Sequence, residues 1–87
     1  MVSKKILICG GSGFIGSNFV RYLHNKYQNY FLVNLDLLTY AGNRLNLSDL
    51  ETSKRYNFIR GDIGDDKLVN KILRRYKFDA VINFAAE

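Results

Sequence analysis

A glycine-rich loop between an apolar run and an amphipathic run constrains the fold of this chain more than any other feature. Residues 5–9 are apolar and rich in isoleucine, which predicts a short buried strand. The loop at 10–16 follows directly and fits both G-x-x-G-x-x-G and G-x-G-x-x-G. Glycines there permit a tight turn and a close approach to a pyrophosphate, and the next helix offers unpaired N–H groups. We predict a phosphate-binding loop, with a plain structural turn as the alternative. Its candidate residues are Gly10, Gly11, Ser12 (as a hydroxyl donor), Gly13 and Gly16.

Strand-like and helix-like runs alternate along the whole chain. The predicted strands cover residues 5–9, 30–35, 56–59 and 80–86. One predicted helix covers residues 14–27, and a short one lies near residues 47–50. A further helix begins at Asp65 and Asp66, which can cap its N-terminus. The apolar face of the first helix is predicted to hold Ile15, Phe19, Tyr22, Leu23 and Tyr27. That of the last helix is predicted to hold Leu68, Val69, Ile72, Leu73 and Tyr76.

This alternation predicts an α/β fold whose strands are buried on both faces. Continuous apolar strands separated by helices are typical of a parallel sheet covered on each side. We expect the N-terminal part of a doubly wound Rossmann sheet with the strand order 3-2-1-4. The crevice between the first and fourth strands would then hold the ligand, and the fourth strand would be an open apolar edge. An isolated chain of this kind is expected to be marginally stable or self-associating.

An acidic residue ends the second predicted strand. Asp36 lies 20 residues beyond Gly16, where a carboxylate can accept hydrogen bonds from the adenosine ribose hydroxyls of a dinucleotide. The same charge would repel a 2′-phosphate, so the sequence favours NAD over NADP. The alternative is that Asp36 is a simple turn residue at the end of a strand.

Two further groups follow the third and fourth predicted strands. Asp62 could bond the exocyclic amine of an adenine while Ile63 packs on the ring; a turn and a core residue are the equally weighted alternative. At the end of the fourth strand, side chains would border the pyrophosphate and the nicotinamide ribose, and small ones leave room there. These residues are Phe84, Ala85 and Ala86.

Composition excludes several other classes of protein. The 87 residues carry a net charge of +5, but the densest cations are spaced along one predicted helix, so a solvated helix face is favoured over a nucleic-acid surface. A single cysteine cannot form an intramolecular disulfide, and no run is long enough to span a membrane. We therefore expect a cytoplasmic protein with no membrane or nucleic-acid partner. No spacing of metal ligands is present, so no metal site is predicted.

Four segments of the chain have a distinctive sequence: residues 10–21, 34–43, 60–64 and 83–87. Together they resemble the N-terminal part of the dTDP-glucose 4,6-dehydratases, which are extended short-chain dehydrogenases/reductases. The second segment, which contains Leu-Thr-Tyr-Ala-Gly-Asn, is the most discriminating. The resemblance covers essentially the whole chain. It implies cofactor contacts at Phe14 and Ile15 beside the pyrophosphate. Around the adenosine it implies contacts at Leu38, Thr39 and Gly42.

The resemblance also implies an activity. Such enzymes oxidise a nucleotide sugar at C4 with bound NAD, eliminate water across C5 and C6, and return the hydride to C6; a homodimer is expected. The family's catalytic tyrosine, lysine and Asp-Glu pair fall beyond Glu87, so residues 1–87 are expected to be one part of the NAD-binding domain, inactive alone. Tyr22 and Lys26 match the family's Tyr-x-x-x-Lys spacing, but they lie on the wrong helix, and we interpret the match as coincidence.

Three alternatives remain open, and a basic nucleic-acid-binding domain is the one that the scattered charge favours least. A related epimerase or decarboxylase that acts on nucleotide sugars would share the glycine loop and the Asn-Phe-Ala-Ala run. A non-catalytic dinucleotide-binding module would share the fold without the chemistry.

Overall fold

The protein folds around a four-stranded parallel sheet. We describe residues 2–38 and 44–84 of a computed structural model. The strand order is β3-β2-β1-β4, and all three neighbouring pairs are parallel, so the predicted order is confirmed. The strands are β1 (Lys4–Cys9), β2 (Tyr30–Asp36), β3 (Tyr56–Arg60) and β4 (Ala80–Asn83). The helical elements are α1 (Phe14–Lys26), the 3-10 helix η1 (Arg44–Leu50) and α2 (Asp66–Tyr76).

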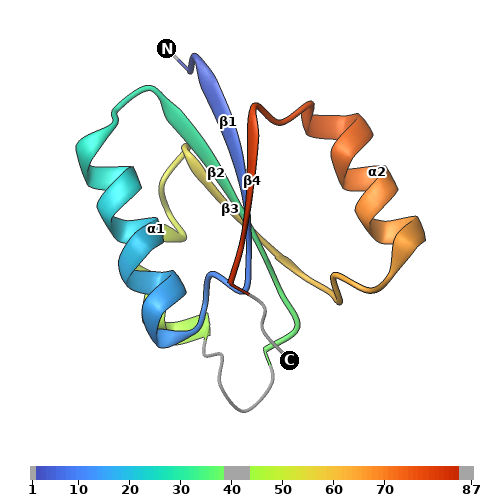
Figure 1. Cartoon of the computed structure of the whole chain (residues 1–87). Helices are drawn as coiled ribbons and strands as arrows, with labels where there is room; N and C mark the ends of the chain where they lie inside the picture. The colour runs from blue at the N-terminus through green and yellow to red at the C-terminus, as the bar shows by residue number, and fades with distance from the viewer. Residues whose placement is uncertain (1, 39–43, 85–87) are drawn as a thin grey trace.

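Helices cover both faces of this sheet, with α1 on one side and α2 on the other (Figure 1). Each face has its own apolar cluster, and β1 contributes to both because successive strand residues point to opposite faces. The cluster on the α1 face contains Ile6, Ile8, Val20, Leu23, Leu32, Leu47, Leu50 and Tyr56. The cluster on the α2 face contains Leu7, Cys9, Val33, Leu35 and Ile72. The doubly wound α/β class expected from the sequence is therefore confirmed.

The buried face of α1 differs from the predicted one. Ile15 and Tyr22 were expected in the core, but they are 69% and 51% exposed. The residues that α1 buries are Gly16, Ser17, Val20 and Leu23. Successive residues of a helix are rotated by about 100° about its axis. A helix that packs Gly16 against the glycine loop therefore directs Ile15 and Tyr22 toward solvent. Close packing at Gly16 thus overrides the simple apolar pattern.

One of the two edge strands of the sheet is β4, and β3 is the other. Strand β4 pairs with β1 through residues 80–83, and Val81 is 54% exposed there. The strand ends at Asn83, and the Phe84 N–H still donates to the Cys9 carbonyl at 2.7 Å. The predicted strand extended to residue 86, but residues 85 and 86 lie outside the described part of the chain. Within the described residues, the open edge expected for the fourth strand is present.

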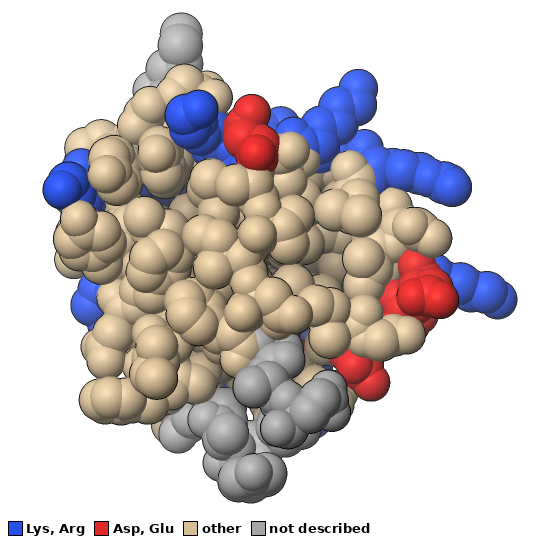
Figure 2. All heavy atoms as spheres, viewed as in Figure 1, with Lys and Arg blue, Asp and Glu red and all other residues tan. Residues whose placement is uncertain are grey.

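Basic side chains gather on α2. Figure 2 shows Lys and Arg side chains projecting on the α2 side of the molecule. The residues Lys67, Lys71, Arg74 and Arg75 are all exposed on this helix. Among the described residues, no helix is long and apolar enough to cross a membrane, and no cluster of metal-ligating side chains occurs.

Candidate functional site

The glycine loop joins the carboxyl end of β1 to α1. Gly10 has φ 77°, a left-handed conformation that residues with a side chain rarely adopt. A Cβ at Gly16 would overlap the carbonyl oxygen of Gly10, so the first turn of α1 rests directly on the loop backbone. These contacts place the N-terminus of α1 at the carboxyl end of β1. Phe84, the residue after β4, lies beside the same end of β1, because its N–H donates to the Cys9 carbonyl.

The N-terminus of α1 has no side-chain cap. Its N-cap residue is Gly13, and no acidic residue lies in the first turn. The other long helix is different, since the Asp65 carboxylate accepts the Leu68 N–H at 3.2 Å and Asp66 lies in its first turn. The first N–H groups of a helix have no intrahelical acceptor and carry partial positive charge. In α1 these groups are therefore suited to hold an anion.

Ser12 is fully buried, and all its polar groups are bonded. Its N–H donates to Asp36 Oδ2 at 2.8 Å, and its carbonyl accepts from Asn46 Nδ2 at 2.8 Å. Its hydroxyl oxygen accepts from Asn34 Nδ2 at 2.9 Å. The structure turns this hydroxyl toward the protein interior, whereas the sequence predicts it as a donor to a ligand. The contact with a ligand stays a prediction.

Asp36 lies at the carboxyl end of β2, next to the glycine loop. It is only 8% exposed, and its two carboxylate oxygens accept the N–H groups of Ser12 and Leu38, each at 2.8 Å. Leu38 has φ 62°, a left-handed turn that directs its N–H back to this carboxylate. Each carboxylate oxygen can accept a second hydrogen bond. Asp36 therefore retains the capacity to bind a ribose hydroxyl while it holds two backbone groups.

The other predicted site residues are less tightly grouped. Asp62 is exposed and its Oδ1 accepts the Gly64 N–H at 2.8 Å, while Ile63 packs against the cluster on the α2 face. Phe84 packs on the opposite face, with its ring 5.4 Å from that of Phe19. Phe14 is 79% exposed, which leaves its ring free at the N-terminus of α1. The predicted contacts at Thr39, Gly42, Ala85 and Ala86 lie outside the described residues.

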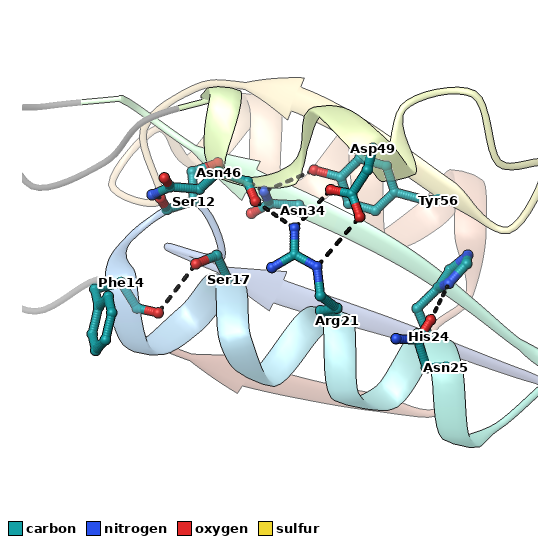
Figure 3. A network of polar contacts seen from close by, with 10 residues as sticks. All are labelled: Ser12, Phe14, Ser17, Arg21, His24, Asn25, Asn34, Asn46, Asp49 and Tyr56. Carbon is teal, nitrogen blue, oxygen red and sulfur yellow. Dashed lines mark hydrogen bonds and ion pairs between the residues drawn. The ribbon is translucent and has the colours of Figure 1, made fainter.

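Sequence reasoning missed the polar residues that support the loop from beneath. Figure 3 shows Asn34 of β2 directed toward Tyr56, and Arg21 of α1 directed toward Asp49. The Arg21 guanidinium donates to Asp49 Oδ1 at 2.6 Å and to the Asn46 carbonyl at 2.7 Å, which ties α1 to η1. The sequence offered one signal for these residues, which is that Asn34 is a polar residue within an apolar strand. That signal does not indicate which groups Asn34 bonds.

Burial and hydrogen bonding shift several pKa values near these elements, among them those of Cys9, Tyr56 and Asp49. Burial raises the pKa of the Cys9 thiol, so this residue is not an activated nucleophile. Burial also raises the pKa of Tyr56, although its hydrogen bond with Asn34 opposes the shift. The hydrogen bond from Arg21 holds the pKa of Asp49 below its ordinary value.

The Tyr22–Lys26 pair lies on the exposed surface of α1. Lys26 Nζ donates to the Tyr22 hydroxyl at 3.0 Å and lies 5.4 Å from the centre of its ring. The pair is two to three turns along the helix from the glycine loop. Its position agrees with the interpretation that its catalytic spacing is coincidental.

A parallel sheet in the order 3-2-1-4, with a glycine loop and an uncapped helix at the end of its central strand, defines a Rossmann-type fold. The sequence model of the family described as GDP-mannose 4,6 dehydratase matches residues 7–87. The chain belongs to this family.

Relatives agree with the resemblance drawn from the sequence. A dTDP-glucose 4,6-dehydratase of Xanthomonas campestris is 51% identical over 81 residues, which are 93% of this chain and 22% of the relative. The crystal structure of dTDP-glucose 4,6-dehydratase from Bacillus anthracis in complex with NAD matches with a TM-score of 0.95 and 39% identity over 98% of this chain and 27% of that one. A UDP-Glc/GlcNAc 4-epimerase from Campylobacter jejuni matches with a TM-score of 0.85 and 34% identity, over 98% of this chain and 25% of that one. The chain thus spans about a quarter of the length of the relatives it matches.

Proposed function

We propose that this chain binds the adenosine and pyrophosphate portions of NAD at the carboxyl ends of β1 and β2. The observation that carries the proposal is the Ser12–Asp36 hydrogen bond of 2.8 Å, which holds the Asp36 carboxylate next to the residue before the uncapped N-terminus of α1. An anion-binding helix terminus and a buried acid are the two groups that recognise a dinucleotide in this fold. The NAD complex of the Bacillus anthracis relative supports the same assignment.

The residues present fit such a cofactor. The N–H groups at the start of α1 would hold the pyrophosphate next to Gly13, Phe14 and Ile15, and Asp36 would accept the adenosine ribose hydroxyls. Bound NAD supplies a hydride acceptor. Because Asp36 is already bonded to two backbone N–H groups, its carboxylate is fixed in place and would repel a 2′-phosphate.

The whole protein is proposed to be a lyase that acts on dTDP-glucose, as its relatives are named. Under this proposal the substrate is a nucleotide sugar and the active form is a cytoplasmic homodimer. No nucleic acid takes part. The catalytic residues would lie outside residues 1–87, and the exposed Tyr22–Lys26 pair would not belong to them. The strongest support is the 51% identity with the Xanthomonas campestris relative across nearly the whole chain.

Calorimetric titration with NAD and with NADP tests the cofactor assignment. We expect NAD to bind more tightly, and Asp36→Ala to weaken NAD binding by about tenfold or more, because it removes charged hydrogen bonds to the ribose. Asp66→Ala is the matched control, since this carboxylate is exposed in the first turn of α2. Equal NAD affinity in wild type and Asp36→Ala would overturn the ribose assignment.

A 4-epimerase is the second candidate, because the Campylobacter jejuni structure matches nearly as much of the chain. The whole protein, supplied with dTDP-glucose and with UDP-glucose, separates the two candidates. A dehydratase forms a 4-keto-6-deoxy sugar with loss of one water, whereas an epimerase leaves the mass of the nucleotide sugar unchanged. Mass spectrometry of the products distinguishes these results directly.

A further inference from the structure

We propose that Asn34 is a positioning residue for the phosphate-binding loop, a proposal that rests on the proposed function of that loop. Its side chain is fully buried in β2 and makes three hydrogen bonds. Asn34 Oδ1 accepts the Gly11 N–H at 2.9 Å. Asn34 Nδ2 donates to Ser12 Oγ at 2.9 Å and to the Tyr56 hydroxyl at 3.1 Å.

The direction of the Asn34 amide follows from its partners. A backbone N–H can only donate, so the oxygen of the amide must face Gly11. Its nitrogen then faces two hydroxyl groups, which accept. In the opposite orientation the amide nitrogen would face the Gly11 N–H as one donor against another, so this amide has a single satisfied orientation.

Gly11 fits the same interaction sterically. A Cβ at Gly11 would lie 2.6 Å from Asn34 Oδ1, closer than real Cβ contacts. Because Gly11 has no side chain, the loop backbone can approach the side-chain amide of Asn34 closely. The loop and β2 are complementary at this point in both shape and hydrogen bonding.

Two residues of β2 that lie two positions apart thus accept hydrogen bonds from consecutive backbone N–H groups of the loop. Asn34 accepts the Gly11 N–H and Asp36 accepts the Ser12 N–H, because side chains two apart on a strand share one face. These two N–H groups point inward and are not available to a ligand. The phosphate-binding donors are then the N–H groups at the start of α1, and Asn34 acts on them by fixing the preceding loop.

A matched asparagine–tyrosine pair provides a control in the same sheet. Asn57 of β3 donates to the Tyr76 hydroxyl at 2.8 Å and is partly buried, but it makes no contact with the loop. Replacement of either asparagine removes an amide from a strand and a hydrogen bond to a tyrosine. Only the replacement of Asn34 removes a bond to the glycine loop.

The binding test compares Asn34→Leu with Asn57→Leu, using NAD and adenosine as ligands. We expect Asn34→Leu to weaken NAD binding by about tenfold or more while adenosine binding changes less than about twofold, because only NAD uses the phosphate-binding donors. Asn57→Leu should change neither. If Asn34→Leu does not fold, Asn34→Ser gives the same test, since its shorter side chain does not span to Gly11. An unchanged ratio of NAD to adenosine affinity overturns the proposal.

Hydrogen exchange at Gly11, measured without ligand, separates this proposal from the proposed function. Asn34→Ser should lose protection of the Gly11 amide, whereas Asn34→Asp should retain it, because a carboxylate still accepts this N–H and can accept from both hydroxyls. This result would support the positioning role even if the wild-type protein bound no NAD. Equal Gly11 exchange in wild type and Asn34→Ser would overturn it.

Discussion

The Ser12 amide nitrogen lies 2.8 Å from the Asp36 carboxylate, which joins the glycine loop to a strand 24 residues further along the chain. The other Asp36 oxygen accepts the Leu38 N–H. One buried acid therefore fixes both the loop after β1 and the turn after β2. The residue proposed to recognise ribose is also part of the support of the phosphate-binding loop.

Asp36→Asn is expected to destabilise the fold at neutral pH. An asparagine can offer one acceptor oxygen, but its NH2 group would then face the second backbone N–H as donor against donor. We expect a loss of about 1–3 kcal/mol in the free energy of unfolding, measured by urea denaturation. Asp66→Asn, in the exposed first turn of α2, is the control. Equal stability of the two variants would show that the paired N–H groups do not depend on the carboxylate.

Gly11→Ala should be costly because Asn34 occupies the space of the new methyl group. We expect about 1–3 kcal/mol of destabilisation in the wild-type background and less in an Asn34→Ala background, where the conflicting oxygen is gone. A double-mutant cycle in urea measures this coupling. Gly64→Ala is the control, since the three atoms nearest to a Cβ there all belong to the exposed Asp62 side chain, the nearest at 3.3 Å. Additive effects in the cycle would contradict the close packing of Gly11 on Asn34.

Asp49 is expected to titrate below its ordinary pKa of about 3.8, because Arg21 donates two hydrogen bonds to its carboxylate. The folded pKa is lowered, so the stabilisation is present above the unfolded pKa and is lost as pH falls through the folded pKa. Carboxyl carbon NMR measures the midpoint, and Arg21→Gln should raise it. Both side chains are substantially exposed, so the contribution to stability should stay below about 1 kcal/mol. A midpoint unaffected by Arg21→Gln would exclude the pair in solution.

Cys9 should react slowly with iodoacetamide in the native protein. Its side chain is 1% exposed in the cluster on the α2 face, and burial raises the pKa of the thiol, so little thiolate forms near neutral pH. Unfolding in urea should accelerate alkylation strongly, as followed by intact mass. Rapid labelling of the native protein, at a rate close to that in urea, would show that the end of β1 opens readily.

Local sequence patterns determined much of the architecture. The apolar runs, the glycine loop and the capping aspartate predicted all four strands and both long helices, and the strand order is the one common to doubly wound sheets. These features depend on short-range sterics and on burial, which neighbouring residues encode directly. The placement of Asp36 at the end of β2 was predictable for the same reason.

Only the tertiary structure decided which residues support the loop and how α1 is rotated. Asn34 and Ser12 are 22 residues apart, Arg21 and Asp49 are 28 apart, and no local periodicity relates them. Ile15 and Tyr22 extended the apolar pattern of α1, yet the close approach of Gly16 to Gly10 turned them to the surface. Backbone packing and the pairing of buried polar groups depend on long-range geometry, and a one-dimensional pattern of apolar residues does not contain that geometry.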